Sequence, residues 1–166
     1  MSEFSTPLIA VDFGTKRVGL AITDPERRVA VGLTTIVGKN EREVAHAIST
    51  LCAERHCNTV IMGHPALGMD RPDNNRGLLD VVSGIERVTD RLKKMDITVI
   101  WWDESCTTAQ VLADRRKIGG KGARKGNWLD FASATLLLQS YLDYQKQPSN
   151  GRTAELVTTD SDGLNF

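Results

Sequence analysis

Four acidic residues stand where the sequence pattern puts the end or the start of an apolar segment. Asp12 and the pair Asp103-Glu104 each close an apolar run, and Asp130 opens the last helical pattern. If folding brings two or three of these carboxylates together, divalent cations relieve their repulsion and lost solvation. Oxygen ligands with few histidines favour Mg²⁺ or Mn²⁺ over zinc. Two such ions about 4 Å apart can activate a water molecule and stabilise the leaving oxygen of a phosphodiester.

Each acid also has a structural explanation. Asp12 could form a turn before Gly14, but an aspartate that ends an apolar strand favours a ligand role. Asp130 fits the electrostatics of a helix amino terminus at least as well. Asp103 and Glu104 are alternatives for one role, and Glu104 is preferred for its longer reach, although it could also cap a following helix. The predicted catalytic and metal-binding residues are therefore Asp12, Glu104 and Asp130.

Basic residues lie beside two of these acids. Lys16 and Arg17 follow Asp12, and a loop rich in glycine, lysine and arginine precedes Asp130. Such a loop suits a phosphate backbone, although a plain solvated connection is an equal alternative. Few aromatic residues lie near these loops, so we expect recognition of nucleic-acid shape rather than base stacking. The candidate substrate-binding residues are Thr15 (or only a turn hydroxyl), Lys16, Arg17, Lys121, Arg124 and Lys125.

The histidines and cysteines offer weaker candidates. The spacing of Cys52, His56 and Cys57 lacks a second ligand pair, so we expect ordinary packing at a helix end rather than a zinc site. Three cysteines without a paired framework predict reduced thiols. His64 is expected to be a loop or packing histidine rather than a general base.

The order of apolar segments predicts the elements that must position these residues. Three β-branched runs with short connections indicate an antiparallel meander, and Asn40 with Glu43 forms a capping box for the first helix. A fourth strand, reached by a right-handed crossover, must pair in parallel with a central first strand. The predicted strands cover about 8–11, 18–22, 29–37, 59–62 and 97–102, and the predicted helices about 40–51, 78–92, 108–116 and 128–144.

This order is that of a ribonuclease H-like α/β domain. Its five-stranded mixed sheet consists of a three-strand antiparallel meander plus two parallel strands, flanked by helices. In such sheets function gathers at the carboxyl ends of the parallel strands. The nuclease domain is predicted at 1–146, with a disordered polar tail at 147–166. The last predicted helix carries Leu129, Ala132, Leu136, Leu137 and Tyr141.

Composition sets broad limits on function. The chain has 166 residues, of which 40% are hydrophobic and 25% charged, as in a globular domain. Its formal net charge of +0 argues against a surface coated for nonspecific nucleic-acid binding, but allows a local basic face. With neither a signal peptide nor a bilayer-length apolar run, we expect a cytoplasmic protein without a membrane partner.

Four segments resemble one known family in order and spacing: VDFGTKRVGLAITD, IMGHPALGMD, WWDESCTTAQ and LDFASATLLLQSYL. They resemble the YqgF/RuvX family of Holliday-junction-resolvase-like nucleases, also described as pre-16S ribosomal RNA nucleases. The resemblance implies a ribonuclease H-like fold, metal-dependent phosphodiester hydrolysis and a role in bacterial ribosome biogenesis. By matching position, Asp12, Glu104 and Asp130 take the roles of the family's acids. His64 and Ser105 depart from the family pattern, which leaves substrate preference open.

We therefore expect a nuclease that uses two Mg²⁺ or Mn²⁺ ions on structured nucleic acid, in 5′-end processing of pre-16S rRNA, with the ribosomal subunit as a partner. A Holliday junction resolvase acting on branched DNA would use the same acids. Two alternatives belong to other classes: a non-catalytic nucleic-acid-binding module, and an actin-like nucleotide-binding protein, since DFGT also resembles a phosphate loop. Both a monomer and a homodimer are compatible with the sequence.

Overall fold

The computed structural model describes residues 5–65, 75–103 and 128–146, and gives only the backbone of residues 128–130. The ranges 1–4, 66–74, 104–127 and 147–166 lie outside the described residues. The helix predicted at 108–116 and the tail predicted at 147–166 therefore stay predictions.

Five strands form one mixed sheet: β1 (Leu8–Phe13), β2 (Arg17–Thr23), β3 (Ala30–Val37), β4 (Thr59–His64) and β5 (Thr98–Asp103). Their order across the sheet is β3-β2-β1-β4-β5. β1, β2 and β3 pair antiparallel, whereas β4 runs parallel to β1 and β5 runs parallel to β4. This topology confirms the predicted meander with two parallel strands and a central first strand.

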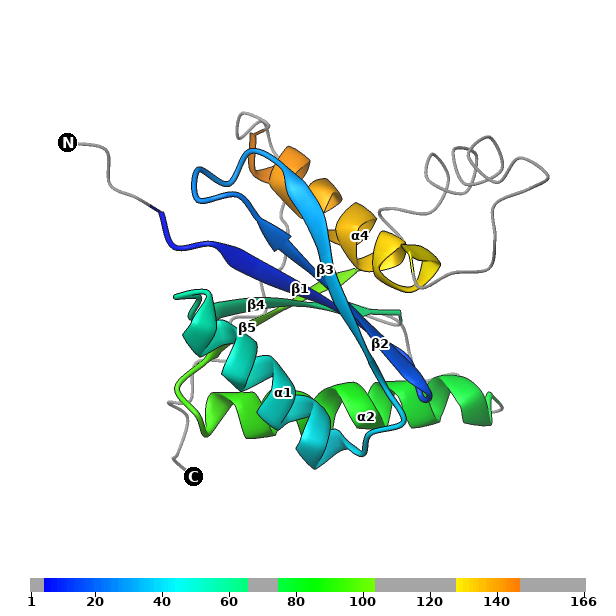
Figure 1. The fold of residues 1–166 in the computed structure, drawn as a ribbon. Coiled ribbons are helices and arrows are strands. Elements are labelled where there is room, and N and C mark those ends of the chain that lie inside the picture. Colours follow the sequence, from blue (N-terminus) through cyan, green and yellow to red (C-terminus); the bar gives the residue numbers. More distant parts are fainter. Residues whose placement is uncertain (1–4, 66–74, 104–127, 147–166) are drawn as a thin grey trace, which may run out of the picture.

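The described helices that cover the sheet are α1 (Glu41–Glu54), α2 (Arg76–Lys93) and α4 (Trp128–Lys146). α1 and α2 lie on one face of the sheet and α4 lies on the other (Figure 1). The predicted capping box is confirmed at the start of α1. The Asn40 side chain accepts a hydrogen bond from the Glu43 N–H at 3.0 Å, and the Glu43 carboxylate accepts one from the Asn40 N–H at 3.1 Å.

The side chains of β1 alternate between two hydrophobic cores, as the pleat of a strand requires. Ile9 and Val11 pack in the core beneath α1 and α2, whereas Leu8 and Ala10 pack in the core beneath α4. None of these four side chains is more than 2% exposed. Because β1 is buried on both faces, the register of this strand determines which face receives each residue that follows.

Small residues on the sheet allow α4 to approach it closely. Gly32 of β3 lies beneath the ring of Phe131, and a Cβ added at Gly32 would stand 2.2 Å from a ring carbon. Only glycine therefore fits this contact as it stands. The buried side of α4 consists of Ala134, Leu137, Leu138, Tyr141 and Leu142.

The inward face of α4 includes only some of the residues named for this helix from the sequence. Of the residues named for this helix from the sequence, Leu137 and Tyr141 are buried, whereas Ala132 and Leu136 are only partly buried. The side chain of Leu129 lies outside the described residues. Because the helix is apolar around much of its circumference, its hydrophobic period does not define a single face.

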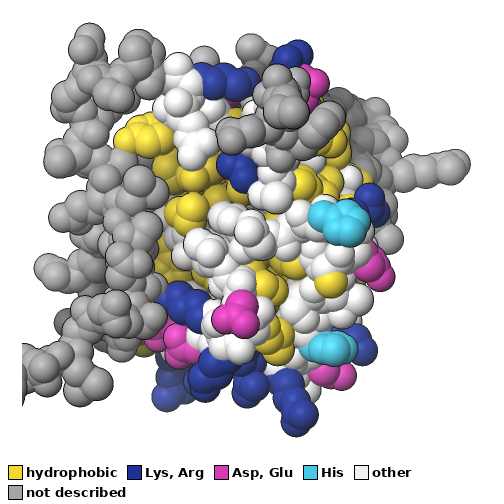
Figure 2. All heavy atoms as spheres, turned by 90° about the vertical axis from the view of Figure 1, so that its left-hand side faces the viewer, with side chains coloured by type: hydrophobic (Ala, Val, Ile, Leu, Met, Phe, Trp, Pro, Cys, Tyr) yellow, Lys and Arg dark blue, Asp and Glu magenta, His cyan; other side chains and the backbone are white. Residues whose placement is uncertain are grey.

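Cationic side chains also gather at the end of the molecule where β1, β4 and β5 begin. Figure 2 looks at this end and shows lysine and arginine side chains along its lower part, where α1 and α2 lie in Figure 1. The predicted site belongs to the other end of these strands. Positive charge alone therefore does not identify the functional edge of the sheet, and the carboxylates are the better guide to the site.

Candidate active site

Asp12 is the described carboxylate of the predicted catalytic set. It lies inside β1, where it pairs with Gly19 of β2, rather than after the end of the strand. Alternation along the strand puts its side chain on the α4 face, together with Leu8 and Ala10. The residue is partly buried. The carboxylate therefore lies at the border between the hydrophobic core beneath α4 and the edge of the sheet.

The first turn of α4 lies near the same edge. In Figure 1 it is on the right-hand side of the sheet, as are the carboxyl ends of β1, β4 and β5. Position 130 precedes the fully buried Ala134 by four residues, which is about one helical turn on the sheet-facing side. The helix backbone thus brings Asp130 to the face of the sheet that carries Asp12, although the side chain of Asp130 lies outside the described residues.

His64 and Asp103 end two adjacent parallel strands and pair with each other in register. Both lie on the opposite face from Asp12. The His64 ring contacts the Trp101 ring, with 4.9 Å between centroids, and the Trp101 indole donates a hydrogen bond to the Thr89 hydroxyl of α2 at 3.1 Å. This side of the sheet is the α1/α2 face, so Asp103 is directed away from the Asp12 carboxylate.

Burial dominates the chemistry of His64, which is only 5% exposed. Its removal from water lowers the pKa of the imidazole, while the negative charges of Glu86 and Asp103 act in the opposite direction. The ring is therefore held as a neutral packing group between β4, β5 and α2. This environment agrees with the expectation that His64 packs rather than acts as a general base for the Asp12 site.

A tight turn carries the first basic candidates. The Gly14 N–H donates a hydrogen bond to the Arg17 carbonyl at 2.9 Å, and a Cβ added at Gly14 would stand 2.6 Å from that oxygen. Thr15, Lys16 and Arg17 are exposed at the tip and at the start of β2. The turn therefore presents two cations within a few residues of Asp12.

The rest of the predicted site lies outside the described residues. This applies to Glu104, to the basic residues Lys121, Arg124 and Lys125, and to the Asp130 side chain. Glu104 is joined directly to the described end of β5. Within the described part of the chain, no group of three or more histidine, cysteine, aspartate or glutamate side chains could hold a metal ion. Cys52 and Cys57 are buried free thiols, in agreement with their predicted packing role.

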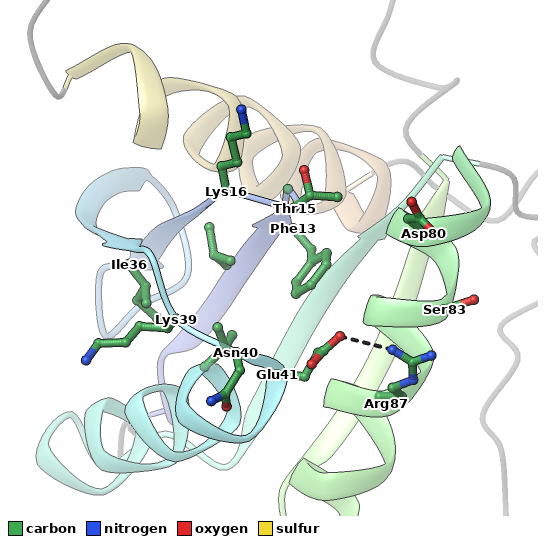
Figure 3. A pocket seen from close by; sticks show the side chains of 13 residues that line it. Phe13, Thr15, Lys16, Ile36, Lys39, Asn40, Glu41, Asp80, Ser83 and Arg87 are labelled. Carbon is green, nitrogen blue, oxygen red and sulfur yellow. Dashed lines mark hydrogen bonds and ion pairs between the residues drawn. The ribbon is translucent and has the colours of Figure 1, made fainter. Parts of the chain in front are cut away.

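The sequence did not reveal a cavity on the α1/α2 face, beside the turn that follows Asp12. Its volume is about 360 Å³. Phe13 and Ile36 line it together with an ion pair in which Arg87 of α2 contacts Glu41 of α1 at 3.1 Å (Figure 3). The turn residues Thr15 and Lys16 were the only sequence signal for it, because the ion pair joins residues 46 positions apart.

Comparison with known proteins identifies the family. The family model described as "RuvX: Holliday junction resolvase" matches residues 6–144. The chain belongs to the RuvX family. It is 36% identical to the "Putative pre-16S rRNA nuclease" of Acetivibrio thermocellus, covering 82% of this chain and 94% of that protein. It is 35% identical to the protein of the same name from Caldanaerobacter subterraneus, covering 84% and 97%.

A solved structure supports the same fold. RuvC of T. thermophilus, in complex with a Holliday junction substrate, matches with a TM-score of 0.55, covering 85% of this chain and 95% of that chain. At 14% identity this likeness concerns the fold alone. This RuvX chain therefore has the predicted ribonuclease H-like architecture and belongs to a family of nucleic-acid nucleases. Within the described ranges, no helix combines the length and apolarity needed to cross a bilayer.

The buried imidazole of this RuvX chain should make its stability depend on pH. The pKa of His64 is lowered in the folded state, so below its ordinary value of 6.5 the unfolded chain binds the proton more readily. Stability should therefore fall as pH decreases from 7 to 5, with a slope from this group no steeper than about 1.4 kcal/mol per pH unit. Urea unfolding of the wild type and of His64→Phe, which retains an aromatic ring beside Trp101, measures the difference. Equal pH slopes in the two proteins would contradict the assignment.

Proposed function

We propose that this RuvX chain is a metal-dependent nuclease that hydrolyses structured nucleic acid, with precursor 16S rRNA as its substrate. The observation that carries the proposal is the partly buried Asp12 on the α4 face, near the edge where the parallel strands end and α4 begins. The names of the relatives from Acetivibrio thermocellus and Caldanaerobacter subterraneus support the choice of RNA. The setting would be the cytoplasm, with the ribosomal subunit as a partner in 5′-end maturation.

The residues that would hold the metal are Asp12, Glu104 and Asp130. All three are carboxylates, which suit Mg²⁺ or Mn²⁺, and they come from the central strand, the segment that follows β5 and the first turn of α4. Because Asp103 faces α2, we favour Glu104 as the metal-binding acid of the segment that follows β5. The chemistry that two such ions would supply is a lower pKa for the attacking water and stabilisation of the leaving 3′ oxygen.

Side chains of the protein would hold and orient the sugar-phosphate backbone of the substrate. Lys16 and Arg17 project from the exposed turn next to Asp12 and can contact phosphates on either side of the scissile bond. Lys121, Arg124 and Lys125 would add further phosphate contacts, and Thr15 can donate its hydroxyl hydrogen to a phosphate oxygen. These contacts carry no base information, so selection among substrates would depend on nucleic-acid shape or on partners.

A second candidate function is cleavage of four-way DNA junctions. The description of the matching family, "Holliday junction resolvase", favours it, and the same three acids would serve. Binding and cleavage of precursor rRNA ends and of a four-way junction, compared at matched salt, distinguish the two substrates. Preferential cleavage of the RNA supports the proposal, whereas preferential cleavage of the junction replaces it with the second candidate.

Replacing the central carboxylate should separate catalysis from binding. Asp12→Asn retains the size of the side chain but removes the charge that would hold a cation. We expect its cleavage rate to fall by at least about a hundredfold, the scale of losing one preorganised electrostatic group. RNA affinity, measured by fluorescence anisotropy, should remain within about threefold of the wild type because the phosphate contacts persist.

Asp24→Asn is a suitable control for that substitution. Asp24 accepts hydrogen bonds from the Arg28 and Val29 N–H groups in the turn between β2 and β3, remote from the sheet edge that carries Asp12. Its cleavage rate should stay near that of the wild type. Undiminished cleavage by highly purified Asp12→Asn protein would refute the catalytic assignment, and would leave the chain without support as a metal-dependent nuclease.

The two neighbouring acids after β5 should behave differently. Glu104→Gln is expected to lower cleavage by about a hundredfold, whereas Asp103→Asn should leave it within about threefold, because Asp103 faces α2 and His64. Cleavage rates at saturating Mg²⁺ and the Mg²⁺ concentration at half-maximal rate test both variants. If Asp103→Asn is inactive while Glu104→Gln is active, the two roles are reversed and the assignment from strand alternation is wrong.

A further inference from the structure

The cavity on the α1/α2 face opens beside the turn that directly follows β1 and Asp12. Phe13 directly follows Asp12 in β1, so alternation directs the two side chains to opposite faces of the sheet. Phe13 contributes to the cavity, as do Gly14, Thr15 and Lys16 of the turn. One short stretch of chain thus belongs to both the proposed active site and the cavity.

Polar and charged groups make up most of the cavity lining, an apolar wall covers part of it, and lysines stand at its rim. In Figure 3, Phe13, Ile36 and Glu41 point into the space, while Lys16 and Lys39 extend outward at its edge. Val18 and Val44 also line it. The apolar wall suits one face of a planar base, the polar groups suit its hydrogen-bonding edge, and lysines at the rim suit the phosphate attached to it.

Glu41 and Asp80 are the acidic residues of the lining, and three cationic residues outnumber them, so the charged groups of the cavity do not make it repel a phosphate. A hydrogen bond from its own N–H lowers the pKa of Glu41, and the Arg87 guanidinium lowers it further, against the opposing effect of burial. The carboxylate is therefore ionised and neutralised by Arg87 at 3.1 Å. Lys39 contacts Glu43 at 3.7 Å with half of its side chain exposed, which is a weak pair that a phosphate could replace.

Size limits the ligand to one unit. A volume of about 360 Å³ lies near the lower end of the range of small-molecule sites, which is roughly 300–1,000 Å³. It can admit a single nucleotide but not a base pair. An unpaired nucleotide beside a cleavage site could enter it while the adjoining backbone follows Lys16 around the turn.

We infer that this cavity binds one unpaired nucleotide, and that it gives the proposed nuclease a preference for substrates with a single-stranded nucleotide beside the scissile bond. The inference rests on the proposed function for its substrate but concerns a separate surface of the sheet. It adds a base-contacting site to a chain whose sequence predicts recognition of shape alone. The shared ligand chemistry is a base joined to a sugar phosphate, whether within a strand or free.

Filling the cavity provides the test. Ile36→Trp introduces a large ring into the space, and Val37→Trp is the matched control, because Val37 is the next residue of β3, is 57% exposed and does not line the cavity. Both variants are made in the Asp12→Asn background, so that binding is measured without cleavage. The probes are an RNA hairpin with a single-stranded extension and the same hairpin with a blunt end.

Ile36→Trp should weaken binding of the extended hairpin by about tenfold, the scale of losing one base contact, and leave the blunt hairpin unchanged. Val37→Trp should bind both hairpins within about twofold of the parent. Lys39→Glu provides a second variant at an exposed position, compared with Arg42→Glu, which changes the same charge on α1 outside the cavity. Lys39→Glu should weaken the extended hairpin more than Arg42→Glu does.

Competition by free AMP and UMP shows whether the cavity accepts a free nucleotide or only a nucleotide within a strand. Displacement of the extension by millimolar mononucleotide supports a site that also accepts free nucleotide, and failure to displace it supports a site for the strand alone. A 4-thiouridine in the extension should crosslink to the segment around Phe13 or Ile36. Equal binding of the extended hairpin by folded Ile36→Trp, Lys39→Glu and their controls, or crosslinks only outside the cavity, would overturn the inference.

The failures of the two proposals are distinguishable. If the wild type cleaves RNA in an Asp12-dependent manner but cavity variants bind normally, the cavity inference alone is wrong. If cavity variants lose the extended hairpin but no preparation cleaves RNA, the proposed function alone is wrong.

Discussion

Burial of β1 on both of its faces is the constraint on which the rest of this structure depends. A strand with solvent on one side could tolerate a slip of one residue, but here a slip would exchange the residues of two packed cores. Leu8 and Ala10 are fixed beneath α4, and Ile9 and Val11 beneath α1 and α2. The alternation continues through the next two residues. The packing of residues 8–11 therefore also places Asp12 and Phe13 on opposite faces of the sheet.

The packing of α4 extends this constraint to a distant part of the chain. Gly32 accepts the ring of Phe131, and Ala134 is completely buried against the sheet. These contacts hold the first turn of the helix near the strand edge, on the same face as Asp12.

Much of the fold could be predicted from the sequence, because its signals are local. The capping box of Asn40 and Glu43, the β-branched runs and the short turns each follow from neighbouring residues. The facing of His64 and Asp103 could not be predicted, since it depends on the register of β4 against β5 and on Trp101. The pairing of Glu41 with Arg87, and the cavity beside it, depend on how α1 packs against α2. The inward face of α4 could not be predicted, because a helix that is apolar nearly all round carries no clear period.

The central claim is that acids from three separate segments converge on bound cations at the α4 face of the sheet. The most direct measurement is a crystal structure of the chain soaked in Mn²⁺, with anomalous scattering used to locate the metal. The account predicts manganese within about 2.5 Å of carboxylate oxygens of Asp12, Glu104 and Asp130. Manganese bound elsewhere while these three carboxylates point away from one another would contradict it.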